Sequence, residues 1–87
     1  SLSHDDEVRR WVIRQLMCNF FLDFEELRTR FGVDFDSYFA SEQHDLGNFE
    51  NEGFLARDPS AVRVLPLGQV FIRNICMAFD AYLKRPE

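Results

Sequence analysis

Hydrophobic residues recur at helical spacing over most of this chain. Near the amino terminus they fall at four-residue steps from Val8 to Phe20, and Ile13 and Met17 widen the same apolar arc. Charged and polar residues occupy the positions between them, as expected for a helix with one buried face. The pattern predicts a first helix that ends near Asn19.

Capping signals mark the ends of the first two helices. Ser3 and Asp6 have the spacing of a helix cap, and acidic residues in this turn suit the positive end of a helix dipole. Asp23 precedes a second helical pattern over residues 24–31, and Gly32 supplies its stop. The sequence therefore predicts one helix from Ser3 onward and a short second helix.

A third helix and a hairpin are predicted in the middle of the chain. Residues 36–52 have a helical pattern that is interrupted at Gly47 and closed by Gly53. Two β-prone pieces, at 54–55 and 62–64, lie on either side of an Asp-Pro-Ser turn signal. A small β-hairpin is the expected structure.

The most apolar helix is predicted at the carboxyl end, over residues 68–84 after Pro66. Its polar residues gather on one narrow stripe, and nearly every other position is apolar. A domain of 87 residues buries only about 60–65% of the surface of its unfolded chain. We therefore expect this helix to leave an apolar surface that docks onto a larger structure. The stripe consists of Gln69, Arg73, Asp80 and Lys84.

These elements predict a fold that is mainly α with a small β-hairpin. Three helices, a hairpin wing and a long C-terminal helix give a winged-helix-like order. With 46% hydrophobic residues and no repeat or low-complexity segment, residues 1–87 are expected to form a single domain. The sequence does not begin with Met, which fits a cloning remnant or an excised fragment better than a natural start, so we expect a fragment of a larger enzyme.

The charge pattern argues against a nucleic-acid partner. The net charge is -5, and the helix that would enter a DNA groove, 36–52, contains five acidic residues and no basic ones. Nucleic-acid binding would require one continuous face of arginines, formed by Arg9, Arg10, Arg14, Arg28 and Arg30. No apolar run approaches the roughly 18 residues that cross a bilayer, so we expect a cytoplasmic protein without a membrane partner.

The two cysteines, Cys18 and Cys76, lie far apart in apolar stretches and have no second ligand at metal-binding spacing. We expect free, buried thiols, and neither a metal site nor a cofactor in this chain. His4 and His44 are expected to be ordinary surface residues.

Four segments carry a family resemblance that spans almost the whole chain: DDEVRRWVIRQLMCNF, FLDF, FGVDFDSYFA and FIRNICMAFDAYL. They resemble the C-terminal domain of bacterial oxygen-independent coproporphyrinogen III oxidases, a radical S-adenosylmethionine family of haem biosynthesis. The sequence departs from the family pattern at Trp11, Leu65 and Gln69, where other residue types are usual.

The resemblance implies a parent enzyme that oxidatively decarboxylates two propionates of coproporphyrinogen III to vinyl groups, yielding protoporphyrinogen IX. The parent's 4Fe-4S cluster and S-adenosylmethionine would be held by a barrel domain with a C-x-x-x-C-x-x-C loop, a motif that this chain lacks. The chain alone is therefore expected to be non-catalytic. By resemblance it packs beside the barrel opening and encloses the substrate, which shields a radical from solvent.

Three arginines are candidate contacts to substrate or to the missing barrel domain, because guanidinium groups bind carboxylates well. Arg9, Arg10 and Arg73 lie in the segments most similar to the family. The alternative is ion pairing within the domain, with Asp5, Asp6, Glu7 or Asp80 as partners.

Asn74 and Trp11 are further candidates. Asn74 falls in the apolar arc of the last helix, where a buried amide would bond either a loop backbone or a ligand. Trp11 falls on the polar side of the first helix, where a large aromatic residue indicates either an interface or packing over Arg14 or the hairpin.

Two other functions stay open at the level of sequence. A stand-alone acidic winged-helix module that binds a basic partner would shelter its last helix internally or in a homodimer, whereas a fragment would leave an orphan apolar patch. A haem-binding protein would use Cys18, His44 or Met77 as axial ligands.

Overall fold

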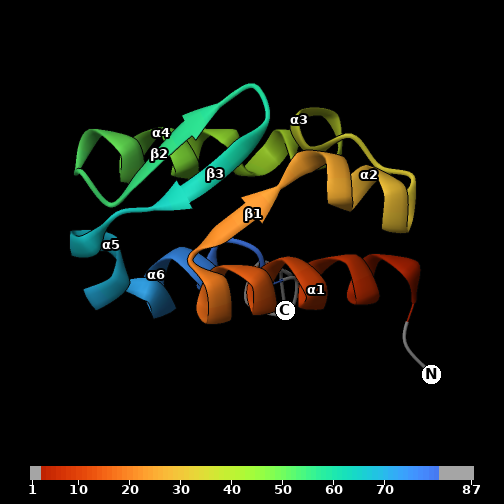
Figure 1. Cartoon of the computed structure of the whole chain (residues 1–87), viewed down its shortest axis with the longest axis horizontal. Coiled ribbons are helices and arrows are strands. Elements are labelled where there is room, and N and C mark those ends of the chain that lie inside the picture. Colours follow the sequence, from red (N-terminus) through yellow and green to blue (C-terminus); the bar gives the residue numbers. More distant parts are fainter. Residues whose placement is uncertain (1–2, 81–87) are drawn as a thin grey trace.

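A three-stranded sheet lies at the centre of the computed structural model, which describes residues 3–80 (Figure 1). Helix α1 (His4–Asn19) packs beside strand β1 (Phe21–Asp23) and helix α6 (Ile72–Met77). Helix α4 (Gln43–Asn51) packs beside strand β2 (Leu55–Asp58). The sheet is therefore contacted by α1 at strand β1 and by α4 at strand β2, and α6 packs on α1.

The first two helices confirm the predicted caps. The Ser3 side chain accepts a hydrogen bond from the Asp6 backbone amide at 3.1 Å, and the Asp6 carboxylate accepts one from the Ser3 backbone amide. Helix α2 (Phe24–Phe31) begins after Asp23, which accepts from the Glu25 amide at 3.0 Å. It ends at Gly32, whose φ of 70° lies in the left-handed region that glycine adopts at little energetic cost.

The predicted third helix over 36–52 is wrong as a single element. Helix α3 (Phe35–Tyr38), a 3₁₀ turn (Ala40–Glu42) and α4 replace it, and the break falls at Phe39 while Gly47 lies inside α4. The Phe39 side chain is fully buried and packs against Phe79, with ring centroids 5.1 Å apart. Burial of this large ring outweighs the small gain from continuing the helix.

The hairpin is confirmed, and it gains a third strand that the sequence did not predict. Strand β3 (Ala61–Val64) pairs antiparallel with both β2 and β1, in the order β1-β3-β2. The centre of β1 sets Leu22 opposite Val62. A three-residue strand between two helices is too short to show the alternation by which strands are recognised in a sequence. Its partner is also distant, since Val62 lies 40 residues along the chain from Leu22.

Aromatic residues form much of the core. Phe24 and Phe35 stack with centroids 4.4 Å apart, and Phe35 also contacts Phe39 and Phe79. The same cluster includes aliphatic residues of α1 and the sheet, among them Val8, Val12, Leu16, Leu22, Val62 and Val64.

The predicted long last helix is wrong over its described part, and its residues 81–84 lie outside the described range. Helix α5 (Pro66–Val70) and α6 are separated at Phe71, whose backbone angles are φ -107° and ψ 28°. Phe71 stacks on Phe54 with centroids 4.9 Å apart, and the Leu65 amide donates to the Phe54 carbonyl. These contacts hold the segment against the start of the hairpin and turn the chain there.

The fold class is therefore mostly helical with a small antiparallel sheet of three strands. The winged-helix comparison stays an interpretation of the element order. Among residues 3–80, no helix combines the length and apolar character that a bilayer crossing requires.

Candidate functional site

Large apolar side chains remain exposed at the carboxyl-terminal helices. Val70 is 75% and Met77 52% exposed, and Met17 of α1 is 42% exposed. Leu67 and Phe71 belong to the same exposed set. The predicted apolar surface is thus confirmed, although a broken helix carries it. A stand-alone module that shelters this region within its own fold does not fit these exposures.

A groove between α1 and α6 brings part of this surface together. We call it the α1–α6 groove; it has a volume of about 330 Å³. Ile13 and Met17 lie one turn apart on α1, and Arg73 and Met77 lie one turn apart on α6. The two helices are in direct contact beneath it, where the Cys76 thiol approaches the Ile13 carbonyl at 3.9 Å. Cys76 and Asp80 complete the lining.

A second hollow, of about 310 Å³, lies on the side of α1 that faces α2. Trp11 packs edge-on against Phe31 at 5.7 Å between centroids, and the Arg30 guanidinium lies over the indole ring at 5.6 Å. Trp11 thus packs on α2, not on the hairpin. Arg10 and Arg14 join these aromatic residues in the lining, together with Glu7.

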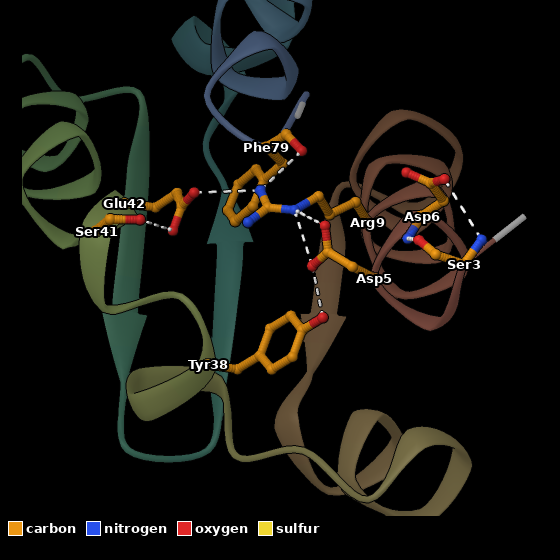
Figure 2. A network of polar contacts seen from close by, with 8 residues as sticks. All are labelled: Ser3, Asp5, Asp6, Arg9, Tyr38, Ser41, Glu42 and Phe79. Carbon is orange, nitrogen blue, oxygen red and sulfur yellow. Dashed lines mark hydrogen bonds and ion pairs between the residues drawn. The ribbon is translucent and has the colours of Figure 1, made fainter. Parts of the chain in front are cut away.

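Arg9 lies in an internal polar network (Figure 2). Its Nε is 2.9 Å from Asp5, and its Nη1 donates to Glu42 and to the Phe79 carbonyl, each at 3.2 Å. Glu42 is only 1% exposed, and Ser41 donates a second hydrogen bond to it at 2.9 Å. The ion pair with Asp5 was one predicted alternative and is confirmed. Glu42 was not predicted, because 33 residues separate it from Arg9.

Tyr38 closes the same network from α3. Its hydroxyl donates to Asp5 at 2.5 Å (Figure 2). Burial, the hydrogen bond to Asp5 and the carboxylate's charge raise the pKa of Tyr38 to about 12, since each disfavours the phenolate, while Arg9 opposes the shift. The network thus joins α1, α3, the 3₁₀ turn and Phe79, which follows α6.

Substitution Tyr38→Phe is expected to lower the free energy of unfolding by about 1 kcal/mol at neutral pH, because one hydrogen bond is lost. The folded-state pKa lies above the ordinary value of 10.0, so this contribution is complete below that pH and disappears as the pH rises to about 12. Urea titrations of both proteins across this range measure the difference. A difference that grows with rising pH would contradict the assignment.

The remaining candidates lie on the outer surface. Arg10, Arg73 and Asn74 are exposed, so the expected burial of Asn74 is wrong. The turn at Phe71 resets the direction of α6, which directs Ile75 and Cys76 into the core instead. Within residues 3–80, ion pairs engage Arg9, Arg28, Arg30 and Arg57 but not Arg10, Arg14 or Arg73.

The five candidates therefore fall into three places. Arg10 and Trp11 share the hollow beside α2, Arg73 and Asn74 are adjacent on α6, and Arg9 lies in the internal network. Sequence reasoning missed Met17 and Met77 as groove residues. Met17 counted as part of the buried arc of α1, and only its position at the edge of that arc could have indicated exposure.

The described residues contain no group of three or more His, Cys, Asp or Glu side chains that could hold a metal ion. Both cysteines are free. Cys76 is buried, as predicted, and burial raises the pKa of its thiol to about 11. Cys18 is exposed, which corrects the prediction, because its side chain leaves α1 on the face opposite Leu16 and the core.

These features define a small, mostly helical domain that exposes apolar side chains at its carboxyl-terminal helices. The sequence profile of the family described as "HemN C-terminal domain" matches residues 2–71. The chain belongs to this family, which confirms the resemblance drawn from its sequence.

Relatives and a solved structure agree with this assignment. The chain is 47% identical over 79 residues to the oxygen-independent coproporphyrinogen III oxidase of Pseudomonas aeruginosa, covering 91% of the chain and 17% of that protein. The Escherichia coli enzyme of the same name is 38% identical over 85 residues, covering 98% of the chain and 19% of that protein. The chain thus spans less than a fifth of the length of these relatives.

The solved structure is described as coproporphyrinogen III oxidase (HemN) from Escherichia coli, a radical SAM enzyme. It superposes with a TM-score of 0.90 at 39% identity over 94% of the chain and 19% of that structure. The likeness therefore extends to the three-dimensional arrangement of nearly every element.

Proposed function

We propose that the chain is the C-terminal domain, residues 1–87, of a cytoplasmic oxygen-independent coproporphyrinogen III oxidase. The parent enzyme would oxidatively decarboxylate two propionates of coproporphyrinogen III to vinyl groups and so yield protoporphyrinogen IX. The observation that carries this proposal is the TM-score of 0.90 at 39% identity to a solved enzyme of that name.

The chemistry of the parent belongs to the polypeptide outside this chain. A four-iron cluster of a radical S-adenosylmethionine enzyme needs three cysteines, whereas the chain has two, of which Cys76 is buried. The residues present do not fit that group. The domain's own contribution is to cover the active site, because covering elements exclude water and hold the reacting groups in place.

The candidates outside the internal network are proposed as contacts to the remainder of the parent or to its substrate: the exposed Arg10, Arg73 and Asn74, and the partly buried Trp11. Coproporphyrinogen III carries four propionates, and guanidinium groups suit carboxylates from either source. Arg9 fits an internal structural role better, since its guanidinium already binds Asp5, Glu42 and a backbone carbonyl.

The test compares the complete parent enzyme with a parent that ends before this domain. We expect the complete protein to convert coproporphyrinogen III to protoporphyrinogen IX anaerobically. The truncated protein should retain its cluster absorbance but lose about 100-fold in kcat/KM, the size of effect expected when reacting groups are misplaced. Full activity after truncation would contradict the covering role. A complete parent that binds haem but shows no turnover would contradict the oxidase assignment.

A further inference from the structure

We propose that the hollow beside α2 binds one edge of the tetrapyrrole substrate, with Arg10 and Arg14 holding the two propionates that the reaction leaves intact. This inference rests on the proposed function and assigns the parent's substrate to one particular surface of the domain. Three observations support it: two arginines without ion pairs, an aromatic wall that is held in place, and a volume that suits part of a tetrapyrrole.

Arg10 and Arg14 are the cationic groups of the hollow. They lie one turn apart on α1, both are exposed, and neither forms an ion pair with another described residue. Glu7 is the one carboxylate in the lining, so two arginines and one glutamate leave the lining positively charged, in a chain whose net charge is -5. A positive hollow on an otherwise acidic domain attracts an anionic ligand.

Trp11 and Phe31 form the apolar wall of the hollow. Their rings meet edge-on with centroids 5.7 Å apart, and the Arg30 guanidinium lies 5.6 Å from the centre of the indole, so two side chains of α2 hold the indole in place. Both rings are only partly buried and line the hollow. A fixed aromatic surface beside two guanidinium groups suits a ligand that has an apolar ring and carboxylates at its edge.

The volume of the hollow limits how much of a ligand it accommodates. At about 310 Å³, it lies at the lower end of the ~300–1,000 Å³ that is usual for small-molecule sites. A complete tetrapyrrole is too large for it. The hollow therefore accommodates one edge of the molecule with the propionates attached there, and the reacting edge extends away from it.

The chemistry of the reaction favours the retained propionates as ligands of these arginines. In protoporphyrinogen IX the two remaining propionates are on neighbouring rings, so two guanidinium groups one turn apart suit the pair. A guanidinium stabilises a carboxylate as an anion, and this stabilisation is lost when the group leaves as neutral carbon dioxide. Binding the reacting propionates in this way would stabilise the ground state more than the transition state, whereas binding the retained pair orients the substrate without that disadvantage.

Binding of mesoporphyrin IX to the complete parent enzyme tests the proposal without depending on turnover, because this porphyrin has only the two retained propionates. In a fluorescence titration, the double variant Arg10→Gln/Arg14→Gln should raise the dissociation constant about 100-fold, about tenfold for each charged hydrogen-bonding group removed. Coproporphyrin III, which has all four propionates, should show the same factor. The variant Glu7→Gln should tighten both complexes, because it removes the carboxylate beside the two arginines.

Two controls separate carboxylate binding from a general disturbance of the surface. Arg28→Gln should leave both dissociation constants unchanged, because Arg28 is 59% exposed on α2 and does not line the hollow. Mesoporphyrin IX dimethyl ester, whose carboxylates are blocked, should bind equally to the wild type and the double variant. If the double variant weakens the ester as much as the free acid, the arginines do not recognise carboxylates and the proposal is wrong.

Unchanged binding of mesoporphyrin IX in the double variant would also overturn the proposal. A loss confined to coproporphyrin III would do the same, since the arginines would then hold the reacting propionates. The oxidase assay separates the two levels of inference. A parent with full turnover whose mesoporphyrin IX binding is insensitive to the double variant removes only this site. A parent without turnover that loses mesoporphyrin IX binding in the double variant removes only the oxidase function.

Discussion

Substitution Arg9→Met is expected to lower the free energy of unfolding by about 3 kcal/mol, the usual result of removing one partner of a buried ion pair. Glu42 is 1% exposed and would lose the guanidinium that lies 3.2 Å from it. The Phe79 carbonyl would lose its hydrogen bond from Arg9. For a domain of this size, with a total stability of about 4–13 kcal/mol, this is a large fraction.

Urea unfolding followed by circular dichroism measures the effect, and two further variants show its origin. Arg28→Met removes a surface ion pair with Glu25 and should cost no more than about 0.5 kcal/mol. The double variant Arg9→Met/Glu42→Leu should be more stable than Arg9→Met alone, because no buried carboxylate is left without the guanidinium. If Arg9→Met matches the Arg28→Met control, the network does not stabilise the domain.

Substitution Gly68→Ala is expected to be equally damaging, with a loss of about 3 kcal/mol. A Cβ atom at this position would overlap the Phe54 carbonyl oxygen, and it would lie 2.7 Å from the Phe54 carbonyl carbon. Both are backbone atoms, so no side-chain rotation can relieve the overlap. The contact between α5 and the start of the hairpin would have to open.

Gly47→Ala is the matched control, since it makes the same chemical change inside a helix. Its Cβ would meet only the Arg57 guanidinium, at an ordinary distance of 3.9 Å. Alanine is favoured over glycine in a helix interior by about 1 kcal/mol, so this variant should be more stable than the wild type. Thermal unfolding of both variants gives the comparison. A Gly68→Ala variant as stable as the wild type would show that the close approach to Phe54 does not exist in solution.

Local signals account for the parts of the fold that the sequence predicted correctly. Ser3, Asp23 and Gly32 act on backbone groups within a few residues, so their effect can be read without knowing the rest of the structure. The hairpin was predictable for the same reason, because Asp58 accepts hydrogen bonds from Ser60 in a local turn.

The candidate site was only partly predictable. The sequence indicated an apolar carboxyl-terminal region, and Val70 and Met77 confirm it. It did not indicate that Met17 would join Met77 in one groove, because that depends on how α1 and α6 pack. It also could not distinguish the internal Arg9 from the exposed Arg10, since both belong to one Arg-Arg pair.

The sequence by itself determined where the first two helices begin and end, the hairpin, the apolar character of the last segment and the family. Only the tertiary structure decided the breaks at Phe39 and Phe71, the third strand, and the pairing of Arg9 with Glu42. The physical reason is the range of the interactions. Caps and turns satisfy backbone groups of neighbouring residues, whereas the burial of an aromatic ring or a carboxylate depends on partners that reach it only when the chain has folded.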